Sequence, residues 1–156
     1  MKKIVLVFLI VFSLSAHTLA SPNYSLGIVL GDFTGMSFQV DKISYSRKKS
    51  TALDFALNFN TGMEYFCLYV DYLLKDNNVV KKVDFTGELP FLCGIGLKMN
   101  SYGKENGYGL RLILGFEYIF KEIPFNVFGT LSPTIDLKPK TSLYLSPSFG
   151  VRYCFK

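Results

Sequence analysis

Apolar side chains occupy every second position over most of this chain, a spacing typical of β-strands that have one apolar face. Between positions 108 and 120, leucines and aromatic residues take the even positions, while Gly, Arg, Ile and Glu take the odd ones. No 3.6-residue apolar stripe follows residue 20. The predicted strands are residues 24–30, 36–45, 51–59, 64–74, 90–99, 108–120, 125–135 and 143–155.

The two faces of these strands differ in a way that indicates their surroundings. One face is almost entirely Leu, Ile, Val, Phe and Tyr, and the other is rich in Gly and Ser with scattered charges. Small and charged residues suit a narrow interior, and an apolar exterior around a polar interior is what a bilayer requires of a barrel. The strand lengths also suit a tilted spanning strand of about 9–11 residues. The alternative is a soluble periplasmic, lipocalin-like barrel that carries an apolar ligand inside.

A membrane sheet cannot leave an open edge, because lipid offers no partner for backbone N–H and C=O groups. The short turn-forming connections between the runs favour neighbouring antiparallel strands. The sequence therefore predicts an all-β fold, an eight-stranded antiparallel up-and-down transmembrane β-barrel.

The N-terminus has the three parts of a secretory signal peptide. Lys2 and Lys3 precede an apolar stretch at 4–12, and small and polar residues lead to Ala20. A spanning helix needs roughly 20 apolar residues, so a membrane anchor is the poorer interpretation. We expect cleavage after Ala20, which gives a signal peptide at 1–20 and a barrel domain at 21–156.

Several functional classes have no support in the mature chain. His17, the only histidine, lies in the expected signal peptide, so His-dependent nucleophilic catalysis and imidazole metal ligands are excluded. We expect no enzymatic activity, catalytic residues, cofactor or metal. No basic stripe with interleaved aromatic residues points to nucleic acid. The three cysteines, Cys67, Cys93 and Cys154, are far apart and odd in number. We expect unpaired thiols rather than one disulfide.

Seven charged side chains fall on the predicted inner face, and these are the candidate site. An eight-stranded barrel is just wide enough to be filled by side chains, and buried charges are costly unless they are paired. A plug of salt bridges is therefore the favoured interpretation, and a selective pore or a proton path is the alternative. The residues are Asp54, Asp71, Lys98, Arg111, Glu117, Asp136 and Arg152.

Short motifs along the whole mature chain suggest a family. They are Gly-Asp-Phe-Thr-Gly at 31–35, Asp-Tyr-Leu-Leu at 71–74, Pro90-Phe91 followed by Gly94 and Gly96, the segment 114–124 and the aromatic ending 149–155. In these motifs the chain resembles the small outer-membrane β-barrel proteins of diderm bacteria. More narrowly, it is similar to an uncharacterised family of such barrels.

The resemblance implies a monomer in the outer membrane, with lipid around it and loops that could meet an extracellular or envelope partner. Two features depart from the family pattern. Lys156 follows the terminal aromatic residue, and the longest connection, 75–87, is the fourth, although even-numbered turns are usually short.

Two prolines need an explanation within predicted strands, because proline cannot donate to a ladder. Pro133 and Pro147 occur in similar Leu-Ser-Pro segments of neighbouring runs. A hairpin centred near Lys140 would place them opposite each other and confine the missing donors to one pair. The alternative is a frayed or bulged sheet near the rim of the barrel.

Overall fold

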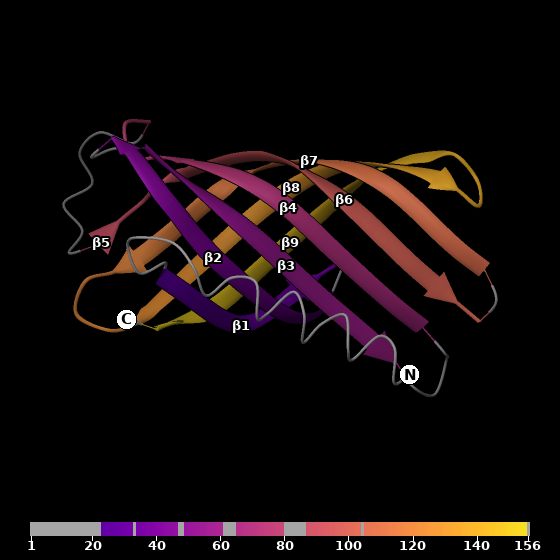
Figure 1. Cartoon of the computed structure of the whole chain (residues 1–156), viewed down its shortest axis with the longest axis horizontal. Helices are drawn as coiled ribbons and strands as arrows, with labels where there is room; N and C mark the ends of the chain where they lie inside the picture. The colour runs from indigo at the N-terminus through magenta and orange to yellow at the C-terminus, as the bar shows by residue number, and fades with distance from the viewer. Residues whose placement is uncertain are drawn as a thin grey trace.

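The computed structural model describes residues 23–32, 34–46, 49–60, 65–79, 87–103 and 105–155, so the expected signal peptide at 1–20 lies outside the described residues. All regular structure in this part of the chain is β-strand (Figure 1). The strands are β1 (Asn23–Gly31), β2 (Gly35–Ser46), β3 (Lys49–Asn60), β4 (Tyr65–Asp76), β5 (Gly87–Glu88), β6 (Phe91–Tyr102), β7 (Glu105–Phe120), β8 (Phe125–Lys138) and β9 (Ser142–Phe155).

Each long strand pairs antiparallel with its neighbours in the chain, and β1 also pairs with β9, which closes the sheet. The two-residue strand β5 is a continuation of β6. Glu88 pairs with Ile119 and Phe91 with Phe116 in one unbroken register along β7, and only Leu89 and Pro90 interrupt it. The fold is therefore a closed eight-stranded antiparallel up-and-down β-barrel, as the alternation predicted.

The strands of this barrel are strongly staggered. Partners followed once around the wall lead from Leu26 through Phe38, Phe55, Val70, Leu97, Leu110 and Ile135 to Leu143. Leu26 itself pairs with Tyr153, so the closed wall is offset by ten residues, the difference between positions 153 and 143. A stagger of this kind tilts the strands, typically by about 35–45° in small barrels, and sets the narrow bore.

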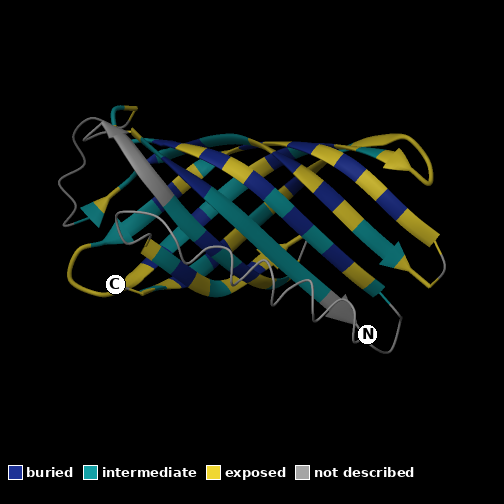
Figure 2. Ribbon diagram, in the orientation of Figure 1, coloured by how far each residue is buried: buried dark blue, intermediate teal, exposed yellow. Residues whose placement is uncertain are grey.

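Burial alternates along β4 and β7 and over much of β1, β6, β8 and β9, and the predicted assignment of the two faces is confirmed on these strands (Figure 2). On β7, Arg111, Ile113 and Glu117 are buried, whereas Leu112 is 56% exposed and Leu114 is 48% exposed. The exposed positions on the other strands carry Leu, Ile, Met, Phe and Tyr. We call this outer surface the apolar belt. Among the described residues, no helix is long and apolar enough to cross a membrane.

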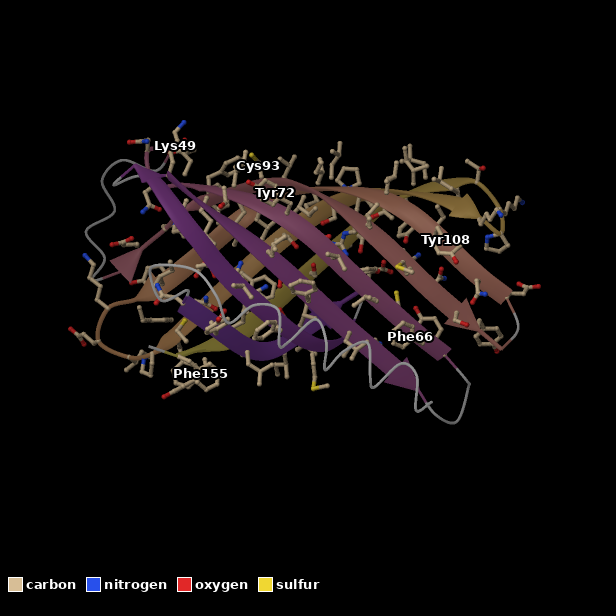
Figure 3. The ribbon with its side chains drawn as sticks, viewed as in Figure 1. Lys49, Phe66, Tyr72, Cys93, Tyr108 and Phe155 are labelled. Carbon is tan, nitrogen blue, oxygen red and sulfur yellow. The ribbon has the colours of Figure 1, made fainter. Side chains whose placement is uncertain are left out.

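Aromatic rings gather on the belt toward the end of the barrel at which the chain ends. Phe91 packs on Phe116 with ring centroids 5.3 Å apart, and Tyr153 packs edge-on against both Phe125 and Phe155. In Figure 3, Phe155 lies toward this end, and Phe66 and Tyr108 lie toward the other. The belt therefore has aromatic side chains near both ends.

Some strand boundaries differ from the prediction. Lys75 belongs to β4 instead of the following connection, and the expected loop 101–107 is largely strand, with Gly103 at φ 57° in the turn between β6 and β7. The strand count and the position of the longest connection, between β4 and β5, stand as predicted. Strand ends were misplaced because lysines and glycines on the inner face resemble turn residues.

The predicted pairing of Pro133 with Pro147 is wrong. Pro133 lies opposite Leu145, and Pro147 lies opposite Leu131, because the hairpin is centred on Pro139 instead of Lys140. The carbonyl of Pro147 accepts from the N–H of Asp32, so the backbone polar groups of Pro147 face the β1 side. Those of Pro133 face β7, where the ladder skips from the pair Arg111–Thr134 to the pair Leu114–Leu131. In each proline, the backbone nitrogen that lacks an N–H therefore faces away from the β8–β9 hairpin.

Candidate functional site

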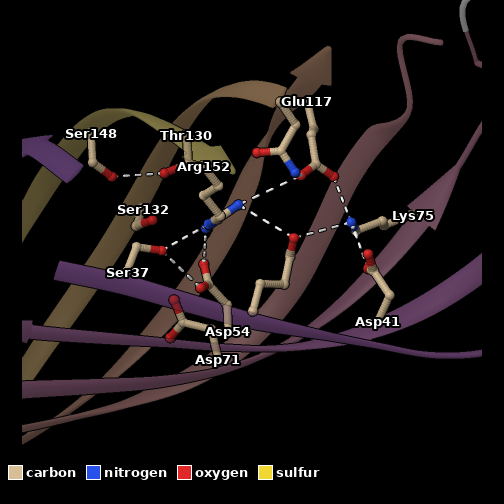
Figure 4. Close-up of polar contacts among 12 residues, drawn as sticks. Ser37, Asp41, Asp54, Asp71, Lys75, Glu117, Thr130, Ser132, Ser148 and Arg152 are labelled. Carbon is tan, nitrogen blue, oxygen red and sulfur yellow. Dashed lines mark hydrogen bonds and ion pairs between the residues drawn. The ribbon is translucent and has the colours of Figure 1, made fainter. Parts of the chain in front are cut away.

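The charged side chains on the inner face form three groups of ion pairs, stacked along the barrel. The largest group lies toward the end of the barrel at which β9 ends, since Arg152 is near the end of β9 and Asn126 near the start of β8. We call it the Arg152 network (Figure 4). It draws on β2, β3, β4, β7, β8 and β9, which only closure of the barrel brings together. Its members are Ser37, Gln39, Asp41, Asp54, Lys75, Glu117, Asn126 and Arg152.

Arg152 is the best-connected side chain of this network and is 1% exposed. One of its terminal nitrogens donates to Asp54 Oδ2 at 2.6 Å, and its Nε donates to Ser37 Oγ at 2.8 Å. The other terminal nitrogen lies 3.5 Å from Glu117 Oε1. The guanidinium also lies over the ring of Phe128, 3.6 Å from its centroid. Such a fully engaged guanidinium is fixed in one position.

Glu117 and Lys75 form the second half of the network. Glu117 has no exposed surface; its carboxylate accepts from Asn126 at 2.6 Å and lies 2.6 Å from Lys75 Nζ. Lys75 also contacts Asp41 at 2.7 Å and donates to Gln39 Oε1 at 3.2 Å. Each buried charge here has an opposite charge beside it, which offsets the cost of removing it from water.

The middle group is looser. Arg111 Nε lies 3.6 Å from Asp71 Oδ1, which is longer than a hydrogen bond. Another nitrogen of Arg111 donates to Ser132 at 3.1 Å, and its guanidinium lies 3.8 Å from the ring centroid of Tyr69. A cavity of about 20 Å³, lined in part by Asp54, Asp71 and Arg111, lies beside this pair. That is room for about one water molecule.

The third group lies toward the opposite end. Lys98 Nζ donates to both carboxylate oxygens of Asp136 at 3.0 Å and to the hydroxyl of Tyr144 at 2.7 Å. This pair and the two groups beyond it include all seven charged residues that the sequence placed on the inner face. The structure brings each of them beside an opposite charge.

Sequence reasoning missed Lys75 and Asp41. Lys75 continues the inward series of Cys67, Tyr69, Asp71 and Leu73, so extending the alternation by two positions past Leu73 would have found it. Asp41 continues the inward series of Ser37 and Gln39 on β2 in the same way. Lys75 falls in the predicted connection 75–87, because a lysine near the end of a run resembles a turn residue. Asp41 lies inside the predicted strand 36–45, but its place on the inner face was overlooked.

The narrow interior of the barrel therefore contains charged side chains that are neutralised in ion pairs and joined by hydrogen bonds. Within the described ranges, no three His, Cys, Asp or Glu side chains gather in a way that could hold a metal ion. The three cysteines are free of disulfides: Cys67 is buried inside, while Cys93 and Cys154 are partly exposed. The geometry of the interior holds buried charged side chains in fixed ion pairs.

Comparison with known proteins gives a fold-level likeness. No protein-family model matches the chain, and no curated protein matches its sequence. Among solved structures, it is similar to the crystal structure of the N-terminal β-barrel domain of Pseudomonas aeruginosa OprF, with a TM-score of 0.53 and 11% identity. The match covers 86% of this chain and 96% of that one. At this identity the likeness concerns the fold, and it agrees with the closed eight-stranded barrel.

Proposed function

We propose that the chain is a small integral outer-membrane β-barrel with a structural or surface-interaction role. The observation that carries this proposal is the inversion of its two faces, with Leu, Ile and Phe on the outside and ion pairs on the inside. In water such an exterior would be unfavourable by about 25 cal/mol for each Å² of apolar surface. In a bilayer the same exterior is matched to its surroundings. The likeness to the OprF barrel domain supports the fold on which the proposal rests.

The proposed protein is made with a signal peptide at residues 1–20 and is exported as residues 21–156. It belongs, on this proposal, to an uncharacterised family of small outer-membrane barrels. It contacts outer-membrane lipid as a monomer, and its end connections meet an extracellular or envelope partner. No enzymatic activity and no binding of nucleic acid form part of the proposal.

The interior is proposed to be filled, so that the barrel does not conduct. The Arg152 network joins six strands across the bore, and the cavity beside Asp71 and Arg111 holds only about 20 Å³. This small volume also disfavours a lipocalin-like carrier, because ligand pockets usually measure about 300–1,000 Å³. In planar bilayers, purified protein should give no steady single-channel current. Regular conductance steps from folded protein would contradict a filled interior.

Electrophoretic mobility with and without heating tests the barrel itself. Residues 21–156, folded in detergent, should migrate differently on an SDS gel when unheated, because a closed barrel survives SDS until it is heated. Far-ultraviolet circular dichroism should show β-structure in detergent or lipid vesicles. A cooperative, monomeric fold in plain buffer, with a mobility that heating leaves unchanged, would contradict the membrane assignment and favour the soluble carrier.

A further inference from the structure

One outward-facing row of residues on the wall has a gap in it. Phe91, Phe116, Gly129 and Phe149 are successive cross-strand partners on β6, β7, β8 and β9, so their outer positions stand side by side. Gly129 is the only one of the four without a ring, and a Cβ built there would have no atom within 4 Å. Adjacent strands are about 4.8 Å apart, so the strands of Phe116 and Phe149 are separated by roughly 10 Å across this gap.

The gap opens into a groove of about 420 Å³ on the outer face. Leu114, Phe116 and Leu131 line it with apolar surface, and Phe91 packs against Phe116 at one side. Thr130 and Ser148 also border the groove, but they occupy inner-face positions: both line the interior cavity as well, and their hydroxyls are hydrogen-bonded to each other at 2.8 Å. With no charged side chain in the lining, the groove suits an apolar occupant.

The two sides of the wall differ at this place. Gly115, beside Gly129 in the wall, has no room for a side chain, since its Cβ would lie 2.2 Å from the carbonyl oxygen of Gly129. The inner side of the wall is therefore closely packed here, whereas the outer side at Gly129 is open. The hollow faces outward only.

We propose that this groove binds one acyl chain of a bilayer phospholipid at a fixed position. The inference rests on the proposed function, because the groove is continuous with the apolar belt that we assign to the lipid phase. A flexible hydrocarbon chain fits a slot between two rings and needs no polar partner. An ordered chain there gains dispersion contacts with Phe116, Leu114 and Leu131 that chains elsewhere on the convex belt lack.

The absence of tryptophan from the chain permits a clean optical test. Phe149→Trp places a single fluorophore beside the groove without occupying it. Phe66→Trp, the same exchange on β4, is the matched control on a part of the belt outside the groove. Each variant is folded in detergent and titrated with a phospholipid that carries brominated acyl chains, and the lipid fraction at half-maximal quenching is compared.

We expect half-maximal quenching of Phe149→Trp at a lipid fraction about tenfold below that of Phe66→Trp, as a modest number of added dispersion contacts would produce. Adding Gly129→Leu to Phe149→Trp should remove this preference, because the new side chain fills the open space. Equal half-quenching fractions for the two single variants would overturn the inference, whether the groove is empty or binds another protein. If brominated lipid at saturation fails to quench Phe66→Trp as well, the proposed membrane location itself is wrong.

Discussion

Removing Arg152 should destabilise the barrel far more than removing the carboxylate of Glu117, although both side chains belong to one network. In the Arg152 network, two cations, Lys75 and Arg152, meet three carboxylates, those of Asp41, Asp54 and Glu117. Its formal charge is therefore −1. Arg152→Met changes this to −2, whereas Glu117→Gln changes it to zero.

The local contacts give the magnitudes. After Arg152→Met, Asp54 keeps only its hydrogen bond from Ser37 at 3.2 Å and has no cation beside it. A buried charge left in this way typically costs about 3–5 kcal/mol. After Glu117→Gln, Arg152 keeps Asp54 at 2.6 Å and Lys75 keeps Asp41 at 2.7 Å. The amide oxygen can still accept a hydrogen bond, so the loss is about 1–2 kcal/mol.

Urea titration of the folded fraction checks this difference. Parent, Arg152→Met and Glu117→Gln proteins are folded in the same lipid vesicles, and the unheated gel mobility reports the folded fraction at each urea concentration. Lys98→Met is the control, because it removes a cation from the separate pair with Asp136. If Glu117→Gln lowers the folding stability as much as Arg152→Met does, the charge-balance argument is refuted and the effect comes from side-chain packing alone.

Three further predictions concern the side chains of the barrel wall. Leu114→Arg should cost about 2–4 kcal/mol if it places a charge at the middle of the lipid face, and equal stability in vesicle unfolding would mean that the faces are assigned backwards. Gly115→Ala should destabilise by about 1–3 kcal/mol through overpacking against the carbonyl of Gly129, whereas Gly129→Ala should be tolerated; the reverse order of urea midpoints would contradict the packing described. Thiol titration of the unfolded, unreduced monomer should find three free thiols, and a lower count would show a disulfide among Cys67, Cys93 and Cys154.

The alternation of residue types was enough to predict the strands, their faces and the seven inward charges. A strand has a side-chain period of two, so once Glu117 is placed inside, Arg111 on the same strand must also point inward. The partners of each charge could not be predicted in this way. Lys75 contacts Asp41 of β2 and Glu117 of β7, and these three strands meet only across the closed bore.

The register of the last hairpin also lies beyond what alternation can reveal. Moving the turn centre from Lys140 to Pro139 shifts the pairing by two residues, so every side chain stays on its own face. A shift by one residue would reverse the faces and would have been visible in the pattern. The turn backbone therefore decides which of Leu131 and Pro133 lies opposite Pro147, and no apolar periodicity records that choice.

The pairing of β1 with β9 places Tyr24 opposite Phe155, so the two ends of the barrel-forming segment are neighbours in space. A closed sheet has no edge strand, so the position of the chain termini is set by the order of the sequence and not by the strand pairing. A circular permutant could join residues 155 and 23 through a short linker and begin at Glu105, after the turn that contains Gly103. It would retain every strand pairing and every interior ion pair while changing the order in which the strands occur along the chain. Such a chain would separate the requirements of the finished barrel from those of its assembly.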